Sequence, residues 1–230
     1  MQFNWLLRTF IILSFFFHYG LMAQDSPKSE KEQDRLIASD QINELHDGIL
    51  IICLPSNQKK IEALQKLSNS NKLEEKRKKR VRDQLASTLA ETAFENQLIQ
   101  AAFEQYYDFS KVLFMFDTAI VSITQKNTRA GVFLNNTLVV DPKLEIGKSS
   151  FFLLHFGRTD PAKTTRVEAM IIKDKQFEPL KAPFPASLKM NTLSYIADLA
   201  LSPKNAFEKN INSRVKKLNK RLHRFYKKSQ

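Results

Sequence analysis

The sequence predicts an α+β fold: a mixed β-sheet with a βαβ-like start, two β-hairpins, a long amphipathic helix and a C-terminal amphipathic helix. Three observations lead to this prediction. Two apolar runs, residues 48–55 ("GILIICLP") and 111–117 ("KVLFMFD"), have the length and composition of buried strands. Neither glycine nor proline occurs in residues 72–107 between them. Residues 203–227 carry apolar side chains at every third or fourth position, which is the spacing of an amphipathic helix.

The segment between the two strands predicts a crossover made of two helices. The first helix spans "SNQKKIEALQKL", with Ser56 or Asn57 as its N-cap, and residues 68–71 ("SNSN") break it. The second covers residues 72–107, and we expect its highly charged first turns to project beyond the core or to pack weakly. If the two strands are parallel, this segment completes a βαβ-type unit.

The apolar side chains of the two long helices predict which faces are buried. In the helix over residues 72–107 the expected stripe consists of Val81, Leu85, Leu89, Phe94, Leu98, Ala101, Ala102, Phe103 and Tyr106. In the last helix the seam consists of Phe207, Ile211, Val215, Leu218, Leu222 and Phe225. Ser202 is a suitable N-cap for this last helix, and Pro203 suits its first position.

Two hairpins are expected after the second strand. "GVFLNNTLVVDP" turns at Asn135-Asn136, and "RVEAMIIKDKQFEPL" turns near Asp174-Lys175. "SSFFLLHFG" between them is a further strand, and "TLSYIADLAL" predicts a short helix.

The N-terminus has the layout of a secretory signal peptide. Arg8 gives a short cationic start, an apolar stretch follows, and cleavage is expected after Ala23. Retention as a membrane anchor is the alternative, although the apolar stretch is shorter than the about 20 residues of a spanning helix. We therefore expect a signal peptide over 1–23, a polar and partly helical leader over 24–46, and one domain over 47–230. The mature protein would be exported and soluble, either periplasmic or extracellular.

Cys53 is the only cysteine of the chain, so an internal disulfide and a Cys-x-x-Cys redox motif are both excluded. It lies inside an apolar run, which favours a buried structural thiol over a nucleophile.

Several segments together suggest a relationship. They are "ILIICLPSNQKKIEAL", "FSKVLFMFDTA", "VFLNNTLVVDP", the Asp-then-Gln-Phe turn with "PFP" after it, and "VKKLNKRLHRFYKK". On these segments, and on its Ala-Gln signal boundary, the chain resembles an uncharacterised family of secreted Bacteroidota proteins over roughly residues 42–228. The resemblance implies export and a single domain, and it implies no activity and no functional residues.

The positive charge of the chain is concentrated in two helical segments. Residues 72–82 contain seven cations and two anions, and residues 203–230 contain ten cations and one anion. Basic amphipathic helices bind anionic surfaces such as lipid headgroups or lipopolysaccharide phosphates. The alternative is that the cations simply face water. The candidate anion-binding residues are Lys76, Arg77, Lys78, Lys79, Arg80, Arg82, Lys216, Lys217, Lys220, Arg221 and Arg224.

Export argues against a nucleic-acid partner, and no aromatic-basic pattern of a known RNA or DNA module occurs. We expect an exported cell-envelope protein that acts as a binding or structural module for an anionic envelope component or a protein partner. No cofactor and no metal site is predicted. An oligomer formed through one of the long helices is a further possibility.

A hydrolase is the competing function. In "LLHFGRTDP", His155 would be a base oriented by Asp160, and Arg158 would hold an anion. The simpler interpretation is a histidine at a strand end beside a turn salt bridge. Asp117 follows the second strand, a position that often lines a site, but helix capping is its expected role.

Overall fold

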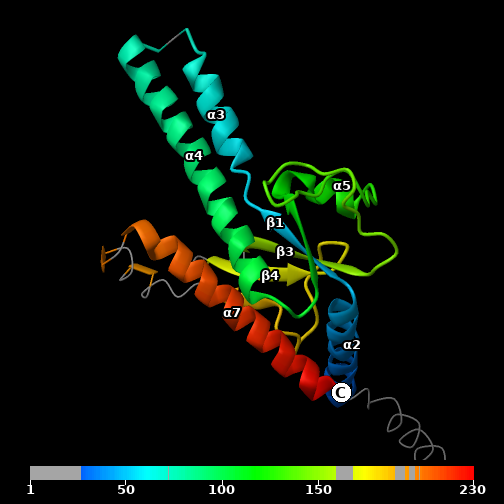
Figure 1. Ribbon diagram of the computed structural model, residues 1–230. Coiled ribbons are helices and arrows are strands. Elements are labelled where there is room, and N and C mark those ends of the chain that lie inside the picture. The colour runs from blue at the N-terminus through cyan, green and yellow to red at the C-terminus, as the bar shows by residue number, and fades with distance from the viewer. Residues whose placement is uncertain (1–26, 72, 159–167, 190–194, 197–199, 202) are drawn as a thin grey trace, which may run out of the picture.

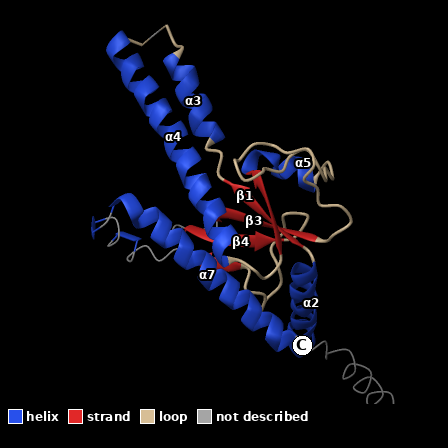
Figure 2. Cartoon of the chain, in the orientation of Figure 1, coloured by secondary structure: helices blue, strands red, loops and turns tan. Residues whose placement is uncertain are grey.

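The computed structural model describes residues 27–71, 73–158, 168–189, 195–196, 200–201 and 203–230. Within them, five strands form one mixed sheet in the order β2-β1-β3-β4-β5, and helices pack around it (Figures 1 and 2). The α+β fold is therefore confirmed. The strands are β1 (Ile49–Leu54), β2 (Lys111–Phe116), β3 (Phe151–Arg158), β4 (Glu168–Lys173) and β5 (Ser187–Lys189).

The sheet begins as a βαβ unit, as predicted. β1 is parallel to β2, with Ile49 beside Lys111, and also parallel to β3, with Ile49 beside Phe151. β4 and β5 continue the sheet as antiparallel strands. All six residues of β1 are buried, which explains why this strand is an uninterrupted apolar run.

Three long helices have nearly the predicted bounds: α3 (Gln58–Ser68), α4 (Glu75–Tyr106) and α7 (Pro203–Ser229). The leader that was expected to be only partly helical forms one long helix, α2 (Pro27–Asp47). A 3-10 turn, η1 (Asp117–Ala119), and the short α5 (Ile120–Thr124) follow β2. The short helix expected over residues 192–201 lies mostly outside the described residues, as does Ser202.

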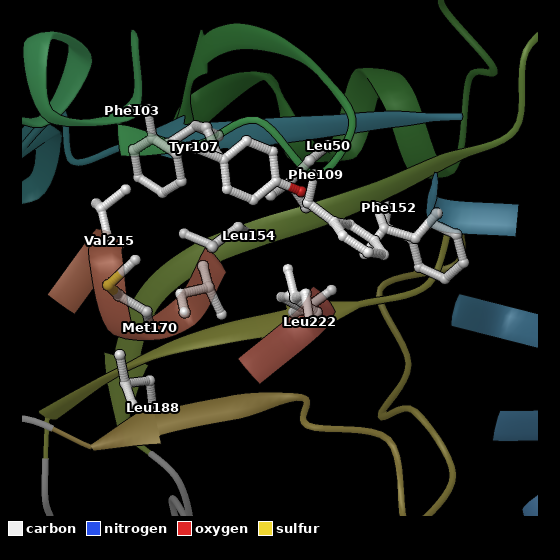
Figure 3. Packing of buried hydrophobic residues seen from close by; sticks show 14 of the residues in the cluster. Leu50, Phe103, Tyr107, Phe109, Phe152, Leu154, Met170, Leu188, Val215 and Leu222 are labelled. Carbon is white, nitrogen blue, oxygen red and sulfur yellow. The ribbon is translucent and has the colours of Figure 1, made fainter. Parts of the chain in front are cut away.

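One face of the sheet is covered by α2, α4 and α7. Figure 3 shows Val215 and Leu222 of α7 in one apolar layer with Leu154 and Met170 of the sheet. The predicted seam of α7 is thus confirmed as a docking surface for its own fold. The seam residues Ile211, Val215, Leu218 and Leu222 are all buried.

The opposite face is covered by α5 and by the irregular chain between α5 and β3. Ile123, Phe133 and Ile146 pack there against the other side of β1, including Ile51 and Cys53. The parallel strands are therefore buried on both faces, which is the usual condition for parallel sheets.

The segment expected as a polar leader contributes to the core. Ala38, Ile42 and Leu45 of α2 are fully buried in the layer that α7 and the sheet form. At the end of α2, the His46 ring stacks on Tyr226 of α7 at a centroid distance of 4.2 Å. This helix therefore packs as one unit with the sheet.

The two predicted hairpins are turns closed by isolated bridges. In the first, Asn135 Oδ1 accepts the backbone N–H groups of Thr137 and Val139, and Leu134 pairs with Val140. In the second, a bridge joins Lys173 to Pro179 around a turn that Asp174 starts. The first turn is longer than the predicted tight turn at Asn135-Asn136, because the residue with positive φ is Leu138 and not either asparagine. Regular ladders do not extend from either turn. Val139 and Val140 are exposed, and none of the five described strands lies beside them to bury them.

Part of the buried stripe predicted for α4 is wrong. Leu89 and Phe94 are 46% and 54% exposed, and Ala101 is also exposed. Instead, Thr88, Thr92 and Asn96 are buried, because this face of α4 meets α3 and the backbone that leaves β1. Asn96 donates to the Pro55 carbonyl and Thr92 accepts from the Asn57 side chain, so polar groups lie at this contact in place of Leu89 and Phe94.

The buried and exposed leucines provide a test of this packing. Leu222→Ala should lower the free energy of unfolding by about 2–5 kcal/mol, because the side chain is fully buried and leaves a cavity. Leu89→Ala, the matched control on the exposed face, should cost less than about 1 kcal/mol. Urea unfolding followed by circular dichroism measures both, and equal losses would contradict the assigned faces.

Candidate functional site

A helical arm extends from the sheet. It consists of α3 and of residues 75–87 of α4, and Figure 1 shows it reaching away from the strands. No residue of α4 before Thr88 is buried. Leu64 of α3 is buried between the two helices, which holds the arm together. The arm is thus a projection outside the main core, as expected for the charged half of this helix.

The end of the arm carries the first cationic segment. We call the six predicted residues of this segment the arm tip: Lys76, Arg77, Lys78, Lys79, Arg80 and Arg82. All except Lys78 are exposed. Lys78 is half-buried, and its Nζ lies 3.2 Å from Glu75 Oε1. Among the described residues, none of the other five forms an ion pair.

The second cationic segment lies on the outer face of α7, opposite the buried seam. Lys217, Lys220 and Arg224 are exposed. Lys216 Nζ lies 4.0 Å from the centroid of the Tyr106 ring, and Arg221 Nη1 donates to the Ser187 carbonyl at 2.9 Å. Two of the five predicted residues therefore tie α7 to its neighbours, and three face solvent.

The two cationic surfaces are far apart. In Figure 1 the arm tip lies at one end of the molecule, and the C-terminal half of α7 lies near the opposite end. A small ligand cannot contact both. Only an extended anionic partner, or two separate partners, could use them together.

The proposed hydrolase residues do not converge. His155 lies on the sheet face of α5, where its ring is 4.9 Å from that of Phe177. Arg158, three residues later, lines a hollow on the other face with Phe207 of α7. Asp160 lies outside the described residues. Alternation along β3 thus sends the candidate base and the candidate anion-binding residue to opposite sides of the sheet.

A polar row on α4 was missed by the apolar-stripe prediction. It consists of Thr88, Thr92, Asn96 and Gln100, which are buried and spaced four residues apart, so they share one face of the helix. This spacing was visible in the sequence. A row of polar residues at this spacing can indicate a buried polar face. Buried polar side chains need hydrogen-bond partners, so such a face determines which groups pack against it.

The polar row organises the loops beside the sheet. Asn96 Nδ2 donates to the Pro55 carbonyl at 2.9 Å, and Gln100 Nε2 donates to the Asn135 carbonyl at 3.1 Å. Asn57 occupies the N-cap position of α3, but its side chain donates to Thr92 Oγ1 at 2.8 Å instead of capping the helix. The row therefore positions the chain that leaves β1 at the carboxyl end of the sheet.

Asp117 also acts on this loop. Its Oδ1 accepts the backbone N–H of Ser56 at 3.1 Å, and it makes no side-chain cap to the 3-10 turn that it begins. The capping role expected for Asp117 in its own helix is therefore wrong. The aspartate instead links the chain that follows β1 to the chain that follows β2.

Cys53 is a buried structural thiol, as predicted. It is 1% exposed, and burial raises the pKa of its thiol well above the ordinary range. A thiol that stays protonated is a poor nucleophile.

None of the described helices has both the length and the apolar character required to cross a membrane. No three His, Cys, Asp or Glu side chains gather as a metal site within the described ranges. Comparison of the chain with protein-family models, with curated proteins and with solved structures finds no match.

The environment of His155 predicts a pH dependence of stability. Burial lowers the pKa of this imidazole, and the Lys173 amine lowers it further. The unfolded chain therefore takes up a proton near pH 6.5 that the folded imidazole binds less readily, so stability should fall as the pH drops through this value. The variant His155→Gln should lose less stability than wild type between about pH 7.5 and about pH 5.5. Thermal unfolding at the two pH values measures this, and equal losses in both proteins would contradict the assignment.

Proposed function

We propose that this chain is an exported cell-envelope protein that binds an anionic partner through its arm tip, with the outer face of α7 as a second contact. The partner chemistry is a surface of phosphate-bearing headgroups, as in anionic phospholipids or lipopolysaccharide. The observation that carries this proposal is the placement of exposed, unpaired cations at the end of a projecting arm.

This placement brings no benefit to the fold. Lys76 with Arg80, and Arg77 with Arg80, are like-charge neighbours on one helix, and such pairs destabilise a helix by a few tenths of a kcal/mol each. They also lie near the N-terminus of α4, where the helix dipole favours anions. A loss of helix stability that no contact within the fold offsets is more typical of a functional surface than of a surface that serves only the fold.

The shape of the arm suits contact with a surface. At 1.5 Å per residue, the 32 residues of α4 extend for about 48 Å, and the half that carries the cations is free of the core. An arm of this kind can meet headgroups without disturbing the sheet. The apolar seam of α7 is buried in the core, so this helix can contact a partner only through the cations on its outer face.

Neutralising the arm tip tests the proposal. The quadruple variant Lys76→Gln, Arg77→Gln, Lys79→Gln and Arg80→Gln should bind anionic vesicles roughly a thousandfold more weakly at low salt, because each of the four basic residues contributes about 1 kcal/mol near such a surface. Co-sedimentation with phosphatidylglycerol vesicles, and separately with lipopolysaccharide, measures the binding and distinguishes the two sources of phosphate.

A matched control separates the arrangement of charges from net charge. Lys126, Lys143, Lys148 and Lys175 are exposed lysines elsewhere in the fold, and their replacement by Gln changes the net charge equally. This control should bind almost as well as wild type. If the arm-tip variant binds both surfaces as tightly as wild type does, the proposal is wrong.

A further inference from the structure

The connection that follows β1 and the connection that follows β2 run to opposite faces of the sheet. β1 leads into α3 and α4, and α4 packs on the α7 side. β2 leads into η1 and α5, and Ile123 of α5 packs on the other side. In open sheets with parallel strands, ligands bind in the crevice that such a divergence creates beyond the carboxyl ends of the strands.

A crevice of about 450 Å³ occupies this position. Its lining comes from the chain after β1, from the end of β2, from α4 and from the turn at Asn135. The lining residues that matter for ligand chemistry are Ser56, Thr118, Asn96, Ile61, Phe116 and Leu138. The volume is within the range of about 300–1,000 Å³ that is typical of small-molecule sites.

A buried acceptor in this lining lacks a partner. Asn96 is 2% exposed, and its Nδ2 is used by the Pro55 carbonyl. Its Oδ1 has no hydrogen-bond partner among the described residues. An unmet buried acceptor costs free energy, and a ligand that donates an O–H or N–H group to it would remove that cost.

The charge of the other lining residues favours a neutral ligand. No charged side chain borders this crevice in the described part of the chain. A charged ligand would therefore lose water without gaining a counter-ion there. Lys59, Lys60 and Asp117 border a neighbouring hollow, where the Asp117 carboxylate already accepts the Ser56 N–H.

The lining of the crevice combines polar and apolar groups. The hydroxyls of Ser56 and Thr118 can donate to a ligand, Asn96 can accept, and Phe116 and Leu138 present apolar surface. This combination suits a molecule with several hydroxyls on an apolar carbon ring. We propose that the crevice binds a neutral saccharide of one or two rings, with a donor group of the sugar on Asn96 Oδ1.

A blocking variant tests the proposal without removing any hydrogen bond. Ala93 lines the crevice and is exposed, so Ala93→Phe should fill the crevice and leave the fold intact. Ala101→Phe is the matched control, because it places the same side chain on an exposed position of α4 outside the crevice. Asn96→Ala removes the acceptor directly, and circular dichroism reports whether that variant folds.

The probes are glucose, N-acetylglucosamine and the β-1,4-linked disaccharide of N-acetylglucosamine, with glucose 6-phosphate as an anionic comparison. Saturation-transfer NMR and titration calorimetry on the full chain measure binding. We expect saturable binding of a neutral sugar, retained in Ala101→Phe and weakened at least about tenfold in Ala93→Phe and in folded Asn96→Ala.

Three results would overturn the proposal: no saturable binding of any neutral probe, unchanged binding in Ala93→Phe, or tighter binding of glucose 6-phosphate than of glucose. The crevice contains no arm-tip residue, so these outcomes are independent of the vesicle experiment.

Discussion

β1 lies between two parallel neighbours, and all six of its residues are buried. A parallel neighbour cannot be reached by a tight turn, so the chain must cross a face of the sheet each time it returns. It crosses one face through α3 and α4 on the way to β2, and the other through α5 and the following loop on the way to β3. Both layers of the core follow from this single constraint.

The same crossover generates the arm. α4 is longer than the sheet that it covers, so its first half projects beyond the core together with α3 (Figure 1). Nothing in the core requires the cations at its end. In α7, by contrast, one helix serves two purposes, because its apolar seam fills the core and its cations remain outside. The two basic segments look alike in composition, but they differ in what they contribute to the fold.

The polar row of α4 connects the fold to the crevice. Thr92 and Asn96 hold the chain after β1, and Gln100 holds the turn at Asn135. A leucine row at these positions would bury more apolar surface, but it would leave these loops without their hydrogen bonds. The row therefore determines the shape of the carboxyl edge of the sheet, where Asn96 keeps one acceptor unused.

The sequence by itself determined the α+β class, the βαβ start, the seam of α7 and the burial of Cys53. Each of these depends on local periodicity or on a continuous apolar run, which neighbouring residues encode. Only the tertiary structure decided which face of α4 is buried and that α2 supplies core residues. These outcomes depend on partners distant in the chain, such as Pro55 for Asn96 and Ser56 for Asp117. A hydrogen bond across 41 or 61 residues leaves no periodic trace in the sequence, so its effect becomes visible only when the sheet brings the two groups together.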